Sequence, residues 1–114
     1  MRGFTMSDSV HFVTTARPRS GQALAAAKWW RDKGQSFFAS MPGVKGVTAY
    51  AVQFGLGGEY SVEIWQEIDG YAALDKWATE FRAQRQNYDL FGEFLQLYEV
   101  GPTRILGRWP EMRL

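Results

Sequence analysis

A strand that runs directly into an aromatic helix is the feature that limits the possible folds of this chain most. Residues 60–68 alternate apolar and polar side chains, which is the period of a half-buried β-strand. Asp69 and Gly70 end the alternation, and over residues 71–81 aromatic and aliphatic side chains return at helical spacing. The pattern therefore predicts a strand that carries Trp65 and continues, after a short turn, into a helix.

The rest of the chain shows the same two periods and predicts three further strands and three helical segments in all. We expect Ser20 and Asp69 to cap the first and second helices with their side chains. The Pro-Gly pair at 42–43 is expected to end the first helix, and the Gly-Pro pair at 101–102 the last one. The Gly-rich residues 55–58 suit a hairpin. The further strands are expected at residues 10–16, 47–54 and 103–109, and the helices at residues 20–40, 70–85 and 88–98.

The order strand, helix, strand, strand, helix, strand predicts a ferredoxin-like α+β fold. In this fold the four strands form one antiparallel sheet, and the helices cover one of its faces. Bulky side chains occur in both registers of the strands, with Ile64 in one and Trp65 in the other, so the second face should also be sheltered. A second copy of the chain, related by a twofold axis, is the simplest cover. We expect a flexible leader at residues 1–9 and a single domain at residues 10–114.

The composition excludes several classes of function. With 13 basic and 12 acidic residues the formal net charge is +1, so the chain lacks the basic excess of a nucleic-acid-binding scaffold. It has no cysteine, and its 1 histidine with scattered carboxylates forms no recognisable set of metal ligands. No apolar run approaches the roughly 20 residues of a membrane span, and the first residues do not have the pattern of a secretion signal. We therefore expect a cytoplasmic protein without metal, nucleic-acid or membrane partners.

His11 is the residue whose chemistry best suits proton transfer near neutral pH, because an unperturbed imidazole titrates there. It shares a strand register with Val13 and Thr15 and so can open into a cleft. Tyr50, on the second predicted strand, is a candidate hydrogen-bond donor in the same space. The alternative interpretation is that His11 only forms a hydrogen bond and packs near the beginning of its strand.

Aromatic side chains of the predicted helices form a second group of candidates. Placed at helical spacing, they are suited to roof an apolar pocket for a flat ligand. The alternative is that they are ordinary core residues. The residues that we expect to bind a substrate are Trp30, Phe37, Trp77 and Phe81.

The layout resembles the dimeric α/β-barrel superfamily, in which two ferredoxin-like subunits press their sheets together. The resemblance covers roughly residues 10–109. It rests on the turn MPGVKGV at residues 41–47, on the strand EIWQE at residues 63–67 that leads into Asp69, and on Ala72, Leu74 and Trp77 in the helix that follows.

Within this superfamily the chain resembles most closely the antibiotic-biosynthesis-type monooxygenases and the related haem-degrading enzymes. In these proteins a Trp near the end of the third strand lines a cleft between sheet and helices, which implies that role for Trp65. The haem enzymes need a ligating His on the second helix, and residues 70–98 contain no His, so no cofactor is expected. The only His is His11 on the first strand; the cofactor-free monooxygenases often place an Asn on that strand, and this chain has none there.

Two functions remain open at this point. The first is cofactor-independent oxygenation or cyclisation of an aromatic or polyketide-like molecule by a homodimer, with His11 as base, Tyr50 as donor and Trp65 as wall. The second is a non-catalytic homodimer, ligand-binding or structural, in which these residues pack and Trp65 is a core or interface anchor. Glu63 and Glu67 share a register with Trp65 and could do acid–base work as paired carboxylates, but we expect them to lie at the sheet edge or to pair with Arg104 or Arg108 of the last strand.

Overall fold

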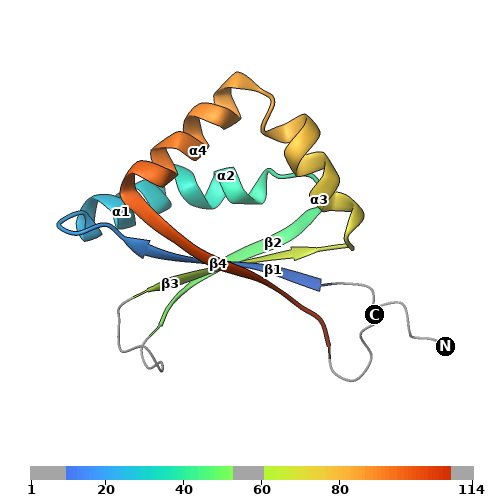
Figure 1. Cartoon of the computed structure of the whole chain (residues 1–114), viewed down its shortest axis with the longest axis horizontal. Coiled ribbons are helices and arrows are strands. Elements are labelled where there is room, and N and C mark those ends of the chain that lie inside the picture. The colour runs from blue at the N-terminus through green and yellow to red at the C-terminus, as the bar shows by residue number, and fades with distance from the viewer. Residues whose placement is uncertain (1–9, 53–60, 109–114) are drawn as a thin grey trace.

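The chain folds into four strands that form one sheet and into helices that cover one side of it. The computed structural model describes residues 10–52 and 61–108. Its elements are β1 (Val10–Pro18), α1 (Ala23–Trp29), η2 (Trp30–Gly34), α2 (Gln35–Ala39), β2 (Val44–Ala51), β3 (Val62–Ile68), α3 (Ala72–Lys76), η3 (Trp77–Phe81), α4 (Arg85–Leu97) and β4 (Tyr98–Leu106). The sheet order is β2-β3-β1-β4, with every neighbouring pair antiparallel. All the helices lie on the same side of the sheet (Figure 1). This is the ferredoxin-like α+β fold that the order of elements predicts.

Alternation along the strands separates the sheet's side chains into two sets. The ring of Phe12 lies 5.1 Å from that of Trp77, on the side of the helices. The ring of His11 lies 5.4 Å from that of Trp65, on the opposite side. Because Phe12 pairs with Gln66 across the ladder, Gln66 belongs to the same side as Phe12. We call the side under the helices the helix face, and the other side, which no described element covers, the open face.

The core lies between the helix face and the helices. Ile64 and Ile68 on β3 and Phe94 on α4 are among its largest fully buried side chains. The hydroxyl of Tyr98 donates to the carbonyl oxygen of Ala26 at 2.8 Å, so the first residue of β4 is joined to α1. Helices, sheet and edge strand therefore share one packed interior.

Two of the helical segments contain a π-helical turn that begins at a tryptophan, η2 after α1 and η3 after α3. The backbone N–H of Gln35 donates to the carbonyl oxygen of Trp30, and that of Arg82 donates to the carbonyl oxygen of Trp77 at 3.1 Å. Each bond reaches back five residues in place of four, which inserts one residue into the turn. The predicted first helix is thus one continuous helical run, composed of α1, η2 and α2.

The two predicted side-chain caps are wrong. Ser20 does not cap the first helix, because Gly21 takes a φ of +76° and the chain turns before α1 begins at Ala23. Asp69 does not cap the second helix either, since α3 follows Tyr71 without a side-chain cap. That helix also ends earlier than predicted, at the end of η3.

The last helix ends at Leu97, next to the predicted residue 98, but Gly101 and Pro102 do not stop it, because they lie inside β4. The strand begins directly after α4, at Tyr98. The pairing of β4 with β1 changes register between Thr14 and Ala16, and an extra residue of β4 is accommodated there. A proline is tolerated at this place because β4 is an edge strand.

The predicted stop after the first helix is confirmed. Helix α2 ends at Ala39, and Gly43 takes a φ of +78° before β2 begins. A Cβ at Gly43 would lie 2.7 Å from the Cβ of Ala73, so the turn packs directly against α3. The predicted leader at residues 1–9, the hairpin at 55–58, and residues 53–54, 60 and 109 of the predicted strands lie outside the described residues.

Candidate functional site

A cavity of about 320 Å³ lies between the helix face and the helices. Strands β1, β3 and β4 form one wall, and residues of α2, α3, η3 and α4 form the other. Most of its surface is apolar, with aromatic rings from Phe12, Phe38, Trp77, Phe91 and Phe94. A mainly apolar cavity with a few polar groups is typical of small-molecule sites.

Gln66 is the most deeply buried polar residue of the cavity wall, with 1% of its surface exposed. Its Nε2 donates to the carbonyl oxygen of Phe38 at 2.9 Å and to the sulfur of Met41 at 3.2 Å. Both partners are acceptors only, so the amide oxygen Oε1 must be the atom that points away from them. Within the described part of the chain no group donates a hydrogen bond to this oxygen.

Thr14 and Thr103 add two hydroxyl groups to the same wall. They pair across β1 and β4, and Thr14 is 7% exposed. Because Thr14 lies two residues after Phe12 on β1, its side chain is on the helix face, as is the amide of Gln66. A hydroxyl can both donate and accept, so these groups can adapt to either type of ligand atom.

Arg82 is the one ionisable residue among the described residues that line the cavity. It is exposed and follows η3, which places it at the opening of the cavity. Its guanidinium carbon lies 4.8 Å from the centre of the Phe91 ring, a cation–π distance. Arg82 forms no ion pair with any carboxylate of residues 10–52 and 61–108.

Trp77 holds η3 over the cavity. Its Nε1 donates to the carbonyl oxygen of Pro42 at 2.7 Å, and its ring meets that of Phe12 edge to face. One side chain thus joins the helix, the turn after α2 and the sheet. These contacts therefore hold the cavity wall in place at Trp77.

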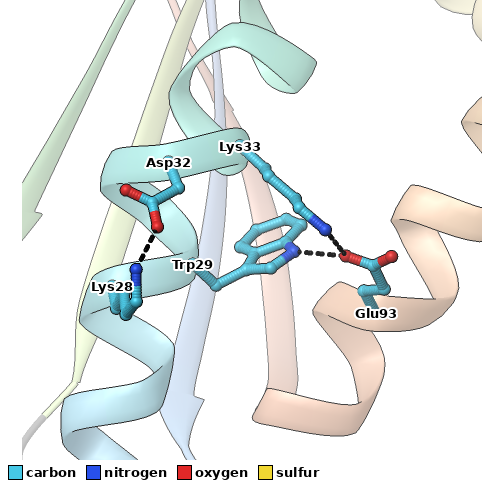
Figure 2. Close-up of polar contacts among 5 residues, drawn as sticks. All are labelled: Lys28, Trp29, Asp32, Lys33 and Glu93. Atoms are coloured by element: carbon cyan, nitrogen blue, oxygen red, sulfur yellow. Dashed lines mark hydrogen bonds and ion pairs between the residues drawn. The ribbon is translucent and has the colours of Figure 1, made fainter.

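A polar cluster joins α1 and η2 to α4, the helix that carries Phe91 and Phe94 (Figure 2). The Nε1 of Trp29 donates to Oε1 of Glu93 at 2.8 Å, and the Nζ of Lys33 lies 3.2 Å from the same oxygen. The indole hydrogen bond and, next, that from Lys33 hold the pKa of the Glu93 carboxyl below its ordinary value. The cluster therefore ties α4 to α1 and η2 through side chains that do not line the cavity.

His11, Tyr50 and Trp65 come together on the open face. The ring of Trp65 lies 5.4 Å from that of His11 and 6.0 Å from that of Tyr50, with both contacts close to edge-on. Its Nε1 donates to Oε1 of Glu63 at 3.1 Å, while Arg104 donates to Oε2 of the same carboxylate at 2.7 Å. The expected pairing of Glu63 with a basic residue of the last strand is confirmed.

The position of Trp65 differs from the one that the resemblance implied. It lies in register with Val13, on the face away from the helices, and so does not line the cavity between sheet and helices. Strand alternation is the physical reason, because the neighbouring residue Gln66 takes the inward position. His11 and Trp65 share only a broad, open depression on the outer side of the sheet.

The comparisons with known proteins find no matching family model and no matching curated protein. Solved structures do match over most of the chain. SnoaB, a cofactor-independent oxygenase from Streptomyces nogalater, is 16% identical with a TM-score of 0.58, over 87% of this chain and 91% of that one. A NIPSNAP family protein from Agrobacterium tumefaciens is 14% identical with a TM-score of 0.72, over 90% and 87%. A protein from Chloroflexus aurantiacus, provisionally assigned as an antibiotic biosynthesis monooxygenase, is 12% identical with a TM-score of 0.59, over 88% and 92%.

The likeness is one of fold. The chain has the ferredoxin-like fold of these monooxygenase-type and NIPSNAP structures, as the resemblance in its sequence implied. Identities this low do not carry over an activity or a set of residues.

The structure divides the predicted site residues among three places, which are the cavity, the core around it and the open face. Trp77 lines the cavity, whereas Trp30, Phe37 and Phe81 belong to the surrounding core. His11, Tyr50 and Trp65 lie on the open face. Sequence reasoning missed four polar residues of the cavity wall, which are Thr14, Gln66, Arg82 and Thr103.

A signal for Gln66 was present in the sequence. It lies on the same face of β3 as Val62, Ile64 and Ile68, and these three residues are all apolar. A polar side chain in a buried register needs a hydrogen-bond partner, so it marks a polar position inside the protein.

No group of acidic or histidine side chains that could hold a metal ion occurs among the described residues. None of the described helices has the length and apolar character needed to cross a membrane.

Proposed function

We propose that the protein binds a small, flat and mainly apolar molecule between its sheet and its helices, and that it oxygenates this molecule without a cofactor. The observation that carries the proposal is the cavity under η3, with aromatic walls and a few polar groups. Its volume of about 320 Å³ lies at the small end of the range for ligand pockets. A compact ring system suits this space better than a long flexible chain.

Oxygenation is supported by the likeness in fold to SnoaB and by the position of Arg82. A guanidinium beside the cavity favours the ionised form of a bound phenol or enol and so lowers its pKa. Such anions are electron-rich enough to react with molecular oxygen. When a ring methylene becomes a carbonyl, one oxygen atom enters the substrate and the other leaves as water with the two hydrogens. The substrate supplies all the electrons, and no cofactor is needed.

A homodimer formed through the open face is part of the proposal. On that face Tyr50 is 53% exposed and its ring contacts that of Trp65. The same face carries the ion pair of Glu63 with Arg104. Aromatic residues bordered by charged ones are typical of protein interfaces. We assign His11 and Tyr50 to this interface because they do not line the cavity. With no cysteine in the chain, a cytoplasmic location completes the proposal.

The function can be tested with anthrone, a flat tricyclic ketone that has an activated methylene carbon. We expect the protein to accelerate oxygen uptake and formation of the quinone in the presence of a chelator. Ala78 lines the cavity and Thr79 does not, so Ala78→Phe should abolish the acceleration while Thr79→Phe keeps it. His11→Ala should also keep it.

The possible results separate the two functions that the sequence left open. No uptake above that of buffer, or equal uptake by Ala78→Phe, would contradict oxygenation in the cavity. Tight binding of anthrone without turnover would support the non-catalytic alternative. Loss of turnover in His11→Ala, with thermal stability unchanged, would return His11 to the role of base.

A further inference from the structure

We infer that the molecule bound in the cavity is a hydroxy-aromatic acid, with a hydroxyl at its buried end and an anionic group at its outer end. The inference rests on the proposed function, since it concerns the ligand of the same cavity. It goes further because it states which polar groups that ligand carries and where each of them binds.

The buried end of the cavity requires a hydrogen-bond donor. Gln66 lines the cavity and is 1% exposed, and no donor in the described chain reaches its Oε1. The amide cannot be turned over to solve this, because Oε1 would then face the Phe38 carbonyl oxygen and the Met41 sulfur. An unpaired acceptor in such a place is costly, so a ligand that brings a donor is favoured over one that does not.

A hydroxyl is the donor that the surroundings of Gln66 suit best. Thr14 stands on β1, the strand next to that of Gln66, and Thr103 stands on β4 beyond it, with hydroxyls that donate or accept as required. A ligand hydroxyl can donate to Oε1 of Gln66 and at the same time accept from a threonine. A charged ammonium would lose its hydration here without a carboxylate to pair with, because the described wall has none.

The outer end of the cavity requires an anion. Arg82 is the only charged residue among those that line the described cavity, and it pairs with no described carboxylate. Its contact with the ring of Phe91 orients the guanidinium and leaves its N–H groups available for a carboxylate. Gln66 is buried and Arg82 is exposed, so the two polar groups of the ligand lie at opposite ends of an apolar ring system.

Four naphthalene probes test this arrangement on the full chain. They are 6-hydroxy-2-naphthoate, 2-naphthoate, 2-naphthol and unsubstituted naphthalene, and their Kd values are measured by titration of the intrinsic tryptophan fluorescence. We expect 6-hydroxy-2-naphthoate to bind at least tenfold more tightly than either singly substituted probe. Naphthalene should bind most weakly.

Two variants assign each polar group to its residue. Gln66→Met should abolish the advantage of 6-hydroxy-2-naphthoate over 2-naphthoate, and Arg82→Gln its advantage over 2-naphthol. Arg85→Gln is the matched control, because Arg85 is an exposed arginine that does not line the cavity, and it should change neither ratio. Arg82→Gln keeps the test valid even if Gln66→Met fails to fold, since Arg82 is exposed.

The failure of this inference can be told apart from the failure of the proposed function. If all four probes bind with similar Kd values, and Ala78→Phe blocks them all, the cavity binds ligands and the inference is wrong. If no probe binds, or if Ala78→Phe leaves binding unchanged, the cavity is not a binding site and both proposals are wrong.

Discussion

Trp65 and Gln66 are consecutive residues of β3 whose side chains lie on opposite faces of the sheet. The indole of Trp65 contacts the ring of His11 on the open face, while the amide of Gln66 donates to the Phe38 carbonyl oxygen under the helices. One strand thus contributes to both surfaces that we consider functional. The cavity and the proposed interface are separated by the thickness of a single β-sheet.

Replacement of Gly34 should show how tightly the first helical run is packed. A Cβ at Gly34 would lie 2.7 Å from ring atoms of both Trp29 and Trp30, and the buried ring of Trp29 is held by its hydrogen bond to Glu93. We expect Gly34→Ala to lower the free energy of unfolding by about 1–3 kcal/mol in urea titrations. Gly92 is the control, because a Cβ there meets nothing within 4 Å and Gly92→Ala should stabilise α4 by about 0.5–1 kcal/mol. Equal stability of the two variants would contradict the prediction.

The hydrogen bond of Trp77 should have a measurable effect on stability. Trp77→Phe leaves the carbonyl oxygen of Pro42 without its indole donor, and we expect a loss of about 1 kcal/mol beyond that of the ring atoms. The matched variant is Trp30→Phe, since the indole of Trp30 has no hydrogen-bond partner in the described chain. Denaturant unfolding gives the two losses, and Trp77→Phe should also weaken binding of 6-hydroxy-2-naphthoate. A smaller loss for Trp77→Phe than for Trp30→Phe would speak against it.

The stability of the protein should fall at acidic pH in part through Glu93. The Trp29 indole, followed by Lys33, holds the pKa of Glu93 below its ordinary value of 4.5. A carboxyl with a lowered pKa in the folded state stabilises the protein fully above its unfolded pKa. That contribution is lost as the pH falls through the folded pKa. The Tm of the wild type should therefore fall more steeply from pH 6 to pH 3 than that of Glu93→Gln. Parallel curves would show that the cluster does not contribute.

The open face should be where two copies meet. Light scattering should give a particle of twice 13.0 kDa for the wild type. Tyr50→Glu should convert it to a monomer, because a buried unpaired carboxylate would face the partner subunit. Tyr71 is a matched control, with 51% exposure against 53% for Tyr50, and it lies on the helix side of the molecule. Tyr71→Glu should leave the dimer intact, and a monomeric wild type would refute the interface.

The fold was predictable because local patterns agreed with the final packing. The alternation of Phe12 with His11 separates the two faces of β1 in the sequence as it does in the structure. The helix ends were less predictable, since Ser20 and Asp69 have the side chains of caps but the turn at Gly21 and the packing of the chain before α3 decide otherwise. The preference of a residue for a helix end contributes little to the folding free energy, and tertiary packing overrides it.

The site was harder to predict than the fold. Alternation shows that Trp65 and Gln66 face opposite ways, but it does not show which of them the helices cover. The resemblance therefore placed Trp65 in the cleft under the helices, and the structure has Gln66 there in its place. Arg82 has no local pattern that marks it, because its place at the cavity depends on how η3 packs against α4.

The π-helical turn of η3 accommodates its extra residue within a single turn. An α-helix brings residues four apart onto one face, and this turn does the same for Trp77 and Arg82, which are five apart and joined by a backbone hydrogen bond. Deletion of one exposed residue inside the turn, such as Thr79, would therefore restore ordinary α-helical bonding and leave Trp77 and Arg82 on the same face. The chamber that they enclose should thus survive the loss of one residue from η3.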